Sequence, residues 1–206
     1  MKYHWRHIFK KKEHHGYEAH KTQLGKVWHF LAHEESIASF IVDAILIILI
    51  GKFLLFPGLG MLLDTTYPIV AVVSSSMDHH GQGFDAWWDV NGKWYADHNI
   101  TKEQFETFYK PNGFTKGDVF VVHGIDSEVK VGDILIYVVA GRNEPIIHRV
   151  IAMNPDGTFA TKGDANQGQL AFEESIQQYQ IAGRATAWMP AIGWVKVGLL
   201  EILGRV

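Results

Sequence analysis

Residues 36–56 form the longest hydrophobic run of the chain, SIASFIVDAILIILIGKFLLF. This run has about the length that a helix needs to cross a bilayer. Of its two charges, Lys52 lies near the end and can extend its ammonium to the headgroups. Asp43 lies nearer the start, where a carboxylate costs less than the ~2.5–3.5 kcal/mol of a central position. Because residues 45–50 have no polar face, we predict one transmembrane helix over 36–56 rather than the buried helix of a soluble protein.

Beyond Pro57 the pattern changes to short apolar runs that are rich in Val and Ile. Turn residues such as Gly-Asp and Asn-Pro-Asp-Gly separate these runs, which is typical of strands. They cover residues 68–74, 119–123, 134–140, 146–153, 158–161 and 181–188. Their spacing predicts a mainly β fold, with an all-β domain over residues 57–190 that follows the single membrane helix.

An aromatic-rich insertion at about 79–113 interrupts this pattern. Thr101, with Gln104 three residues later, forms a capping box that predicts a short helix. The aromatic side chains have two interpretations: a second small core, or an apolar surface that dips into the membrane, where Trp and Tyr favour the interface. They are Trp87, Trp88, Trp94, Tyr95, Phe105, Phe108 and Tyr109.

The C-terminal segment, 191–206, has the pattern of an amphipathic helix. It carries Lys196 and Glu201 and is too short and too charged to predict a second membrane span. A helix that lies on the membrane or on the domain is expected instead. One face of this helix would carry Ile192, Val195, Leu199, Ile202 and Leu203.

The charges are distributed unevenly, although the net charge is only −3. Residues 1–35 carry seven basic and four acidic side chains, so this basic segment is expected to stay cytoplasmic. The following domain would then lie outside, on the extracytoplasmic face of the cell membrane. Residues 57–206 carry 11 basic and 17 acidic side chains, which argues against nucleic-acid binding. The long polar lead, with no small-residue cleavage site after the apolar run, favours an uncleaved signal anchor.

Composition also limits the chemistry of the site. There is no cysteine, which excludes disulfides, thiolate metal ligands and a cysteine nucleophile. The chain has 12 histidines, but pairs such as His79-His80 show no recognised metal-ligand spacing on a defined element. We expect no metal and no cofactor, and we interpret the following histidines as solvated surface residues: His4, His7, His14, His15, His20, His79, His80 and His98.

Three features offer groups for catalysis. Three serines, residues 74–76, directly follow a predicted strand, and a serine becomes a nucleophile only when a base takes its proton. His148 lies inside an apolar strand, where it is either a hydrogen-bonded core residue or a general base. Asp164, in the turn Lys-Gly-Asp-Ala-Asn, is either an ordinary turn residue or the acid that orients the imidazole.

Together and in this order, these features resemble the Ser-His type I signal peptidases of archaea and of the endoplasmic reticulum. That family has one N-terminal anchor, a strand ending in Ser-x-Ser-Met, a Gly-Asp-hydrophobic strand, an Ile-His-Arg-Val strand and then Lys-Gly-Asp-Asn-Asn. The chain matches at residues 74–77, 117–119, 132–134, 147–150 and 162–166. The resemblance covers roughly residues 36–78 and 114–196.

The resemblance implies a role for each matched residue. Ser76 would be the nucleophile and His148 the general base. Asp164 would orient the imidazole, and Ser74 would donate to the oxyanion beside the backbone N–H of Ser76. Met77, which completes the serine motif, would contribute to substrate binding.

The chain departs from the family at three places. His79 stands where the family usually has proline, and the long insertion follows it. Leu170 stands where a second aspartate is common. The acid of the triad is therefore open at this stage, with Asn166 and Glu173 as further candidates.

The function that the resemblance implies is a membrane-bound serine endopeptidase that removes signal peptides from exported preproteins. Its expected partners are signal peptides, the lipid bilayer and the protein translocation machinery. One alternative is a catalytically inactive relative that binds or assembles exported proteins. Another is a membrane-anchored structural or metal-binding β-domain.

Overall fold

The computed structural model describes residues 22–33, 36–125 and 128–204, so most of the predicted basic segment 1–35 lies outside the described residues. The chain divides into two units between Leu55 and Phe56. The first contains α1 (Gln23–His33), α2 (Ile37–Ile50) and a π-helical turn (Gly51–Leu55). The second contains α3 (Phe56–Leu62) and all the strands.

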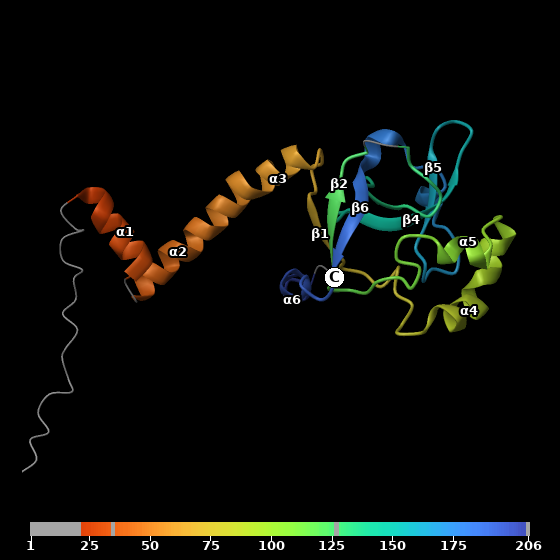
Figure 1. Ribbon diagram of the computed structural model, residues 1–206, viewed down its shortest axis with the longest axis horizontal. Coiled ribbons are helices and arrows are strands. Elements are labelled where there is room, and N and C mark those ends of the chain that lie inside the picture. Colours follow the sequence, from red (N-terminus) through yellow and green to blue (C-terminus); the bar gives the residue numbers. More distant parts are fainter. Residues whose placement is uncertain (1–21, 34–35, 126–127, 205–206) are drawn as a thin grey trace, which may run out of the picture. The chain divides into compact units, whose positions relative to one another are not determined.

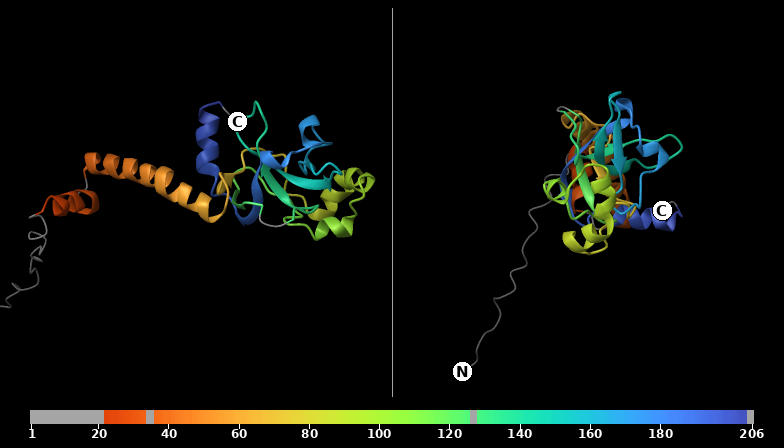
Figure 2. Two further views of the ribbon diagram at one scale, coloured as in Figure 1. Left: turned by 90° about the horizontal axis from the view of Figure 1, so that it is seen from above. Right: turned by 90° about the vertical axis from the view of Figure 1, so that its right-hand side faces the viewer.

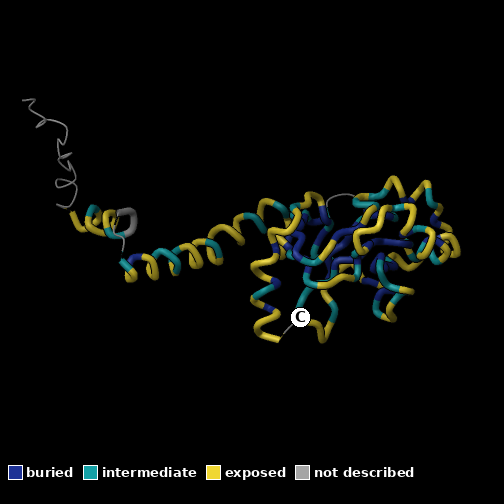
Figure 3. Tube along the Cα trace, turned by 90° about the horizontal axis from the view of Figure 1, so that it is seen from below, coloured by how far each residue is buried: buried dark blue, intermediate teal, exposed yellow. Residues whose placement is uncertain are grey.

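The hydrophobic run forms the one helix of the described residues that is long and apolar enough to cross a membrane, Ile37–Leu62. Ser36 caps its start by accepting a hydrogen bond from the Ser39 backbone N–H at 3.1 Å. The helix continues past the predicted end at residue 56 because the π-helical turn before Pro57 accommodates the missing N–H of proline. Most side chains of α2 are exposed and Ser39 is buried; in Figure 3 yellow stretches of this helix alternate with teal ones.

The second unit is built on a six-stranded antiparallel sheet in the order β1-β2-β6-β3-β4-β5 (Figure 1). The strands are β1 (Ile69–Ala71), β2 (Val119–His123), β3 (Ile134–Tyr137), β4 (Ile146–Met153), β5 (Phe159–Lys162) and β6 (Ile181–Met189). Each lies in a run that the Val- and Ile-rich pattern predicted, to within a few residues. The prediction of a mainly β domain after one apolar helix is confirmed.

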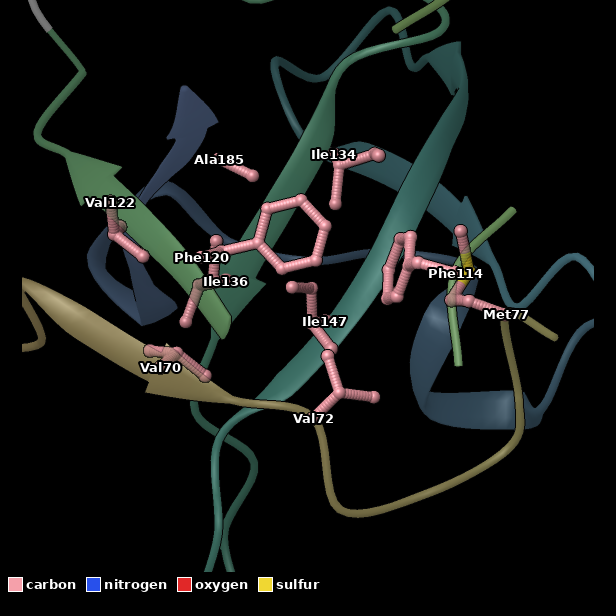
Figure 4. Close-up of a cluster of buried hydrophobic side chains, with 10 residues drawn as sticks. All are labelled: Val70, Val72, Met77, Phe114, Phe120, Val122, Ile134, Ile136, Ile147 and Ala185. Carbon is pink, nitrogen blue, oxygen red and sulfur yellow. The ribbon is translucent and has the colours of Figure 1, made fainter. Parts of the chain in front are cut away.

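The main core lies between the strands and the segment that carries the serines. Phe120 of β2 contacts Phe114 edge-to-face at 4.6 Å between ring centroids. Figure 4 shows these rings among aliphatic side chains of β1, β3 and β4, with Met77 at the edge of the cluster. Met77 is 1% exposed, so the residue after Ser76 is fixed in the core.

The insertion forms α4 (Phe84–Asp97) and α5 (Lys102–Glu106), which lie beside β4 and β5 (Figure 1). Thr101 caps α5 through the N–H of Gln104 at 3.2 Å, as the capping box predicted. Trp87 is 2% exposed and packs with Tyr95 and Phe105 against side chains of β4 and β5. Because Trp87 is buried, it cannot dip into a membrane, and the insertion forms a second core.

The last helix, α6 (Trp194–Ile202), packs on the domain beside the loop before β2; both views of Figure 2 place it at the edge of the sheet. It buries Val197 and Leu200. Its exposed side chains include Val195, Leu199 and Ile202, which belong to the predicted apolar face. Two short 3₁₀ helices, η3 (Ala171–Glu173) and η4 (Gln178–Gln180), lie between β5 and β6.

Candidate active site

Ser76 lies in the segment that follows β1, and its backbone forms a hydrogen bond with the turn after β5. Its carbonyl accepts a hydrogen bond from the Ala165 N–H at 2.8 Å. The next residue, Met77, accepts from the Asp164 N–H through its sulfur at 3.2 Å. The side chain of Met77, which was expected to contribute to substrate binding, is buried in the core and is not part of the cavity lining.

His148 of β4 faces Ser76. The Nε2 atom of His148 lies 2.8 Å from the hydroxyl oxygen of Ser76. Its Nδ1 atom contacts the carboxylate of Glu173 in η3. With the proton on Nδ1 directed at Glu173, Nε2 is free to accept the serine proton, which is the tautomer a general base needs.

Glu173 is held in place as well as buried. It is fully buried, and its second carboxylate oxygen accepts a hydrogen bond from the Leu170 N–H at 2.7 Å. Leu170, which stands where the family often has an aspartate, therefore contributes its backbone N–H. The carboxylate comes from Glu173, one turn further along. The Ser76 hydroxyl, the His148 imidazole and the Glu173 carboxylate thus form a continuous chain of contacts.

Asp164 makes its contacts elsewhere, so the structure does not bring it to the imidazole. It accepts two hydrogen bonds from Arg149, at 3.0 Å from Nε and 2.7 Å from Nη2, and one from the Tyr95 hydroxyl at 3.2 Å. The Nε2 atom of His79 lies 3.4 Å from Oδ2 of Asp164. Burial alone would raise the pKa of Asp164, but Arg149 and His79 hold that pKa well below its usual range.

The environment of His79 also differs from the prediction of a solvated histidine. It is 2% exposed and stacks on Trp87 with ring centroids 3.8 Å apart. The cause is a close approach of backbone: Gly113, at φ +69°, has its Cα against the His79 ring, where a Cβ would lie 2.6 Å from ring carbon Cδ2. His80 by contrast is exposed. Among the described residues, no three His, Asp or Glu side chains gather as a metal site.

Ser74 lies beside Ser76. Its hydroxyl oxygen is 3.1 Å from that of Ser76, and it is exposed to the cavity side. Asn166, the other candidate for the acid, lines the cavity rather than approaching His148 Nδ1. A hydroxyl and the backbone N–H of Ser76 are both donors of the kind that stabilises an oxyanion.

A cavity of about 370 Å³ opens beside the two serines. Its walls are the segment from β1 to Ser76 on one side and the start of β4 on the other. Most of the lining is apolar, and β1 pairs with β2 along one edge only. The lining residues are Val70, Ala71, Val73, Ser74, Ser76, Arg142, Asn143, Glu144, Pro145, Ile146, Ile147, His148, Asn166, Leu170 and Phe172.

Comparison with known proteins agrees with this geometry, although no family model matches the chain. The signal peptidase complex catalytic subunit SEC11 of Colletotrichum graminicola is 28% identical over 180 residues, which are 78% of this chain and 86% of the relative. The subunit of the same name from Scheffersomyces stipitis is 27% identical over 160 residues, 73% of this chain and 76% of the relative. Over about three quarters of its length the chain is therefore similar to catalytic subunits of the signal peptidase complex.

The sequence predicted Ser76, Ser74 and His148 at one site, and the structure brings them together. It left the acid open between Asp164, Asn166 and Glu173. Sequence reasoning missed Arg149 as the partner of Asp164. The available signal was its neighbour: successive residues of a strand face opposite sides, so if His148 faces the cavity, Arg149 faces the other core and needs a buried carboxylate there.

Proposed function

We propose that this protein is a membrane-anchored serine endopeptidase that cleaves signal peptides from exported preproteins. Ser76 would be the nucleophile, His148 the base and Glu173 the orienting acid. The observation that carries the assignment is the chain of contacts from the Ser76 hydroxyl through both nitrogens of His148 to Glu173. It supplies the nucleophile, the base and the fixed tautomer that peptide-bond hydrolysis requires.

The proposed reaction proceeds through an acyl-enzyme. His148 Nε2 removes the proton of Ser76 as its oxygen attacks the carbonyl carbon of the scissile bond. The negative charge that forms on the carbonyl oxygen is stabilised by the Ser74 hydroxyl and the Ser76 N–H. His148 then gives the proton to the departing amine, and a water molecule, deprotonated by the same imidazole, hydrolyses the ester to release the signal peptide.

The cavity supports an extended substrate with small side chains just before the cut. The free edge of β1 offers unpaired backbone groups along the apolar wall, so a peptide can add as a further strand. The volume of about 370 Å³ is shared between the positions that the side chains occupy, which favours small ones. Alternate residues of the bound strand would point into this cavity.

We further propose that the helix Ile37–Leu62 is a single anchor in the cell membrane, with the basic N-terminal segment in the cytoplasm and the catalytic domain on the other face. The uneven charge of the chain supports this orientation. The relatives are named as catalytic subunits of a complex. We therefore expect that this chain works beside the translocation machinery, where its preprotein substrates emerge.

The test is cleavage of a secretory preprotein by the full-length protein in detergent. Wild type should release the mature product after one cut, and Ser76→Ala and His148→Ala should not. Lys93→Met, which changes an exposed side chain of α4, serves as the matched control and should cleave normally. If folded wild type is as inactive as Ser76→Ala against several preproteins, the chain is instead the inactive, binding member of its family.

A further inference from the structure

The rear of the catalytic centre is covered by the aromatic insertion. The carbonyls of Tyr109 and Lys110, both in the insertion, accept hydrogen bonds from Arg149 at 2.8 and 3.0 Å. The Tyr95 hydroxyl donates to Asp164, and the Phe105 ring lies 4.8 Å from the Arg149 guanidinium. The insertion therefore contacts the residue next to His148 on β4 and the residue next to Gly163 in the turn after β5.

Gly163 forms the front of the same turn, against the reacting groups. A Cβ on Gly163 would lie 2.8 Å from the Ser76 carbonyl oxygen and 2.9 Å from His148 Nε2, so the bare backbone packs directly on both. The Ala165 N–H holds the Ser76 carbonyl. A small shift of this turn would therefore displace the serine, the imidazole or both, and a displacement of about 1 Å can cost 10²-fold in rate.

Lys162 lies between the aromatic rings of the insertion and the backbone of Gly163. Its side chain is 1% exposed, and its ammonium donates to the Gly163 carbonyl at 2.9 Å. The ammonium lies 5.0 Å from the ring centroid of Trp94 and 4.8 Å from that of Tyr95, and 3.4 Å from the Tyr95 hydroxyl. Burial lowers its pKa to about 8, against the opposing attraction of Asp164 and Glu173.

An apolar side chain of the same length would fill this enclosure at a lower desolvation cost than a charged one. What the ammonium adds is a strong donor aimed at one backbone carbonyl, plus attraction to two ring faces. We propose that Lys162 is a positioning residue for the proposed peptidase reaction: from the enclosure that Trp94 and Tyr95 of the insertion build, it holds the Gly163 backbone against Ser76 and His148.

This inference rests on the proposed function and gives the insertion a part in catalysis. The test uses the full-length protein in detergent with three variants. Lys162→Met keeps the length of the side chain but removes the donor. Tyr95→Phe keeps the ring but removes the hydroxyl. Lys93→Met makes the same substitution at an exposed site of the insertion and is the matched control.

Two quantities are measured for each variant. The first is kcat and KM for preprotein cleavage. The second is the ¹³Cε1 resonance of His148 in protein with ¹³C-labelled histidine, identified by its loss in His148→Gln. We expect Lys162→Met to lower kcat about tenfold or more with KM within twofold, and to shift the His148 resonance. Tyr95→Phe should lower kcat about threefold, and Lys93→Met should change neither quantity.

A wild-type kcat and an unmoved His148 resonance in Lys162→Met would overturn the inference. If Lys162→Met does not fold, Tyr95→Phe decides in its place, and wild-type kcat there has the same meaning. If wild type cleaves no preprotein, the proposed function fails, but the resonance still reports positioning. A shift of the His148 resonance in Lys162→Met, without one in Lys93→Met, would then support the positioning role of Lys162. An unmoved His148 resonance in Lys162→Met would refute it.

Discussion

His148 and Arg149 are neighbours on β4, yet the two faces of that strand make opposite use of a buried carboxylate. On one face His148, a titratable base, meets Glu173 beside a cavity that is open to substrate. On the other Arg149, a permanent cation, meets Asp164 in a closed core. In the proposed reaction His148 takes up a proton and gives it back while Glu173 stays ionised, whereas Arg149 and Asp164 keep their charges throughout.

This difference shows that a motif can be recognised in a sequence without revealing which side of a strand each of its residues contacts. Asp164 belongs to the motif but contacts Arg149 rather than His148. Asp164 has the chain position of a triad acid, but a carboxylate next to a guanidinium is held ionised and in place by that partner. The imidazole needs an acid on its own face of β4. Glu173 reaches it because η3 turns the chain back toward β4 after the loop that contains Leu170.

The largest expected effect separates the two carboxylates by activity. Glu173→Gln should lower kcat by about 10²–10⁴-fold, because the amide no longer fixes the tautomer and orientation of His148. Its thermal midpoint should stay within a few degrees of wild type. Steady-state cleavage of a preprotein and a thermal melt of the same sample measure both. A stable Asp164→Asn with the same loss of kcat, beside an active Glu173→Gln, would reverse the two roles.

The second effect concerns stability on the closed face. Arg149→Met removes the cation and leaves Asp164 buried without it, which should lower the free energy of unfolding by about 3–5 kcal/mol. Urea denaturation of the detergent-solubilised protein measures the change. The double variant Arg149→Met/Asp164→Leu should recover much of it, because no unpaired charge remains. No recovery would mean that the backbone contacts of Arg149, rather than the ion pair, hold this region together.

The third effect tests the open face again. Ser74→Ala should lower kcat by about 10²–10³-fold if its hydroxyl stabilises the oxyanion, with KM little changed because the interaction is made in the transition state. The comparison variant is Ser75→Ala, next in the chain, which should cleave normally because the contact to the Ser76 hydroxyl comes from Ser74. Equal kcat values for Ser74→Ala and Ser75→Ala would contradict the proposed role of the Ser74 hydroxyl in stabilising the oxyanion.

The smallest effect is a pH dependence of stability that arises from Lys162. Because the pKa of Lys162 is lowered to about 8 in the folded state, the folded protein releases this proton before the unfolded chain does. The free energy of unfolding should therefore rise between about pH 8 and 9.5, by at most about 1.4 kcal/mol per pH unit. Denaturation at three pH values in this window measures the slope. Lys162→Met should flatten it; an unchanged slope would assign it to another group.

The sequence predicted the fold well because strands that are buried on one or both faces leave a strong pattern. The six strands and the span were found from apolar runs and turn residues, and Ser76 and His148 from a family motif. The contact of Glu173 with His148 and the burial of His79 were not found from the sequence, because both depend on contacts between distant segments. Glu173 lies 25 residues from His148, and His79 is buried by Trp87 and Gly113, which no local pattern relates to it.

The strand order has a consequence for how this protein matures during its own synthesis. β1 and β2, which carry the segment with Ser76, pair with each other, and β3, β4 and β5, which carry His148, form a second group. β6 joins the groups, and it is the last strand to be made. In a nascent chain that ends before Ile181, no strand pairing joins the group beside Ser76 to the group that carries His148. We therefore expect a complete catalytic centre only in chains that already include β6.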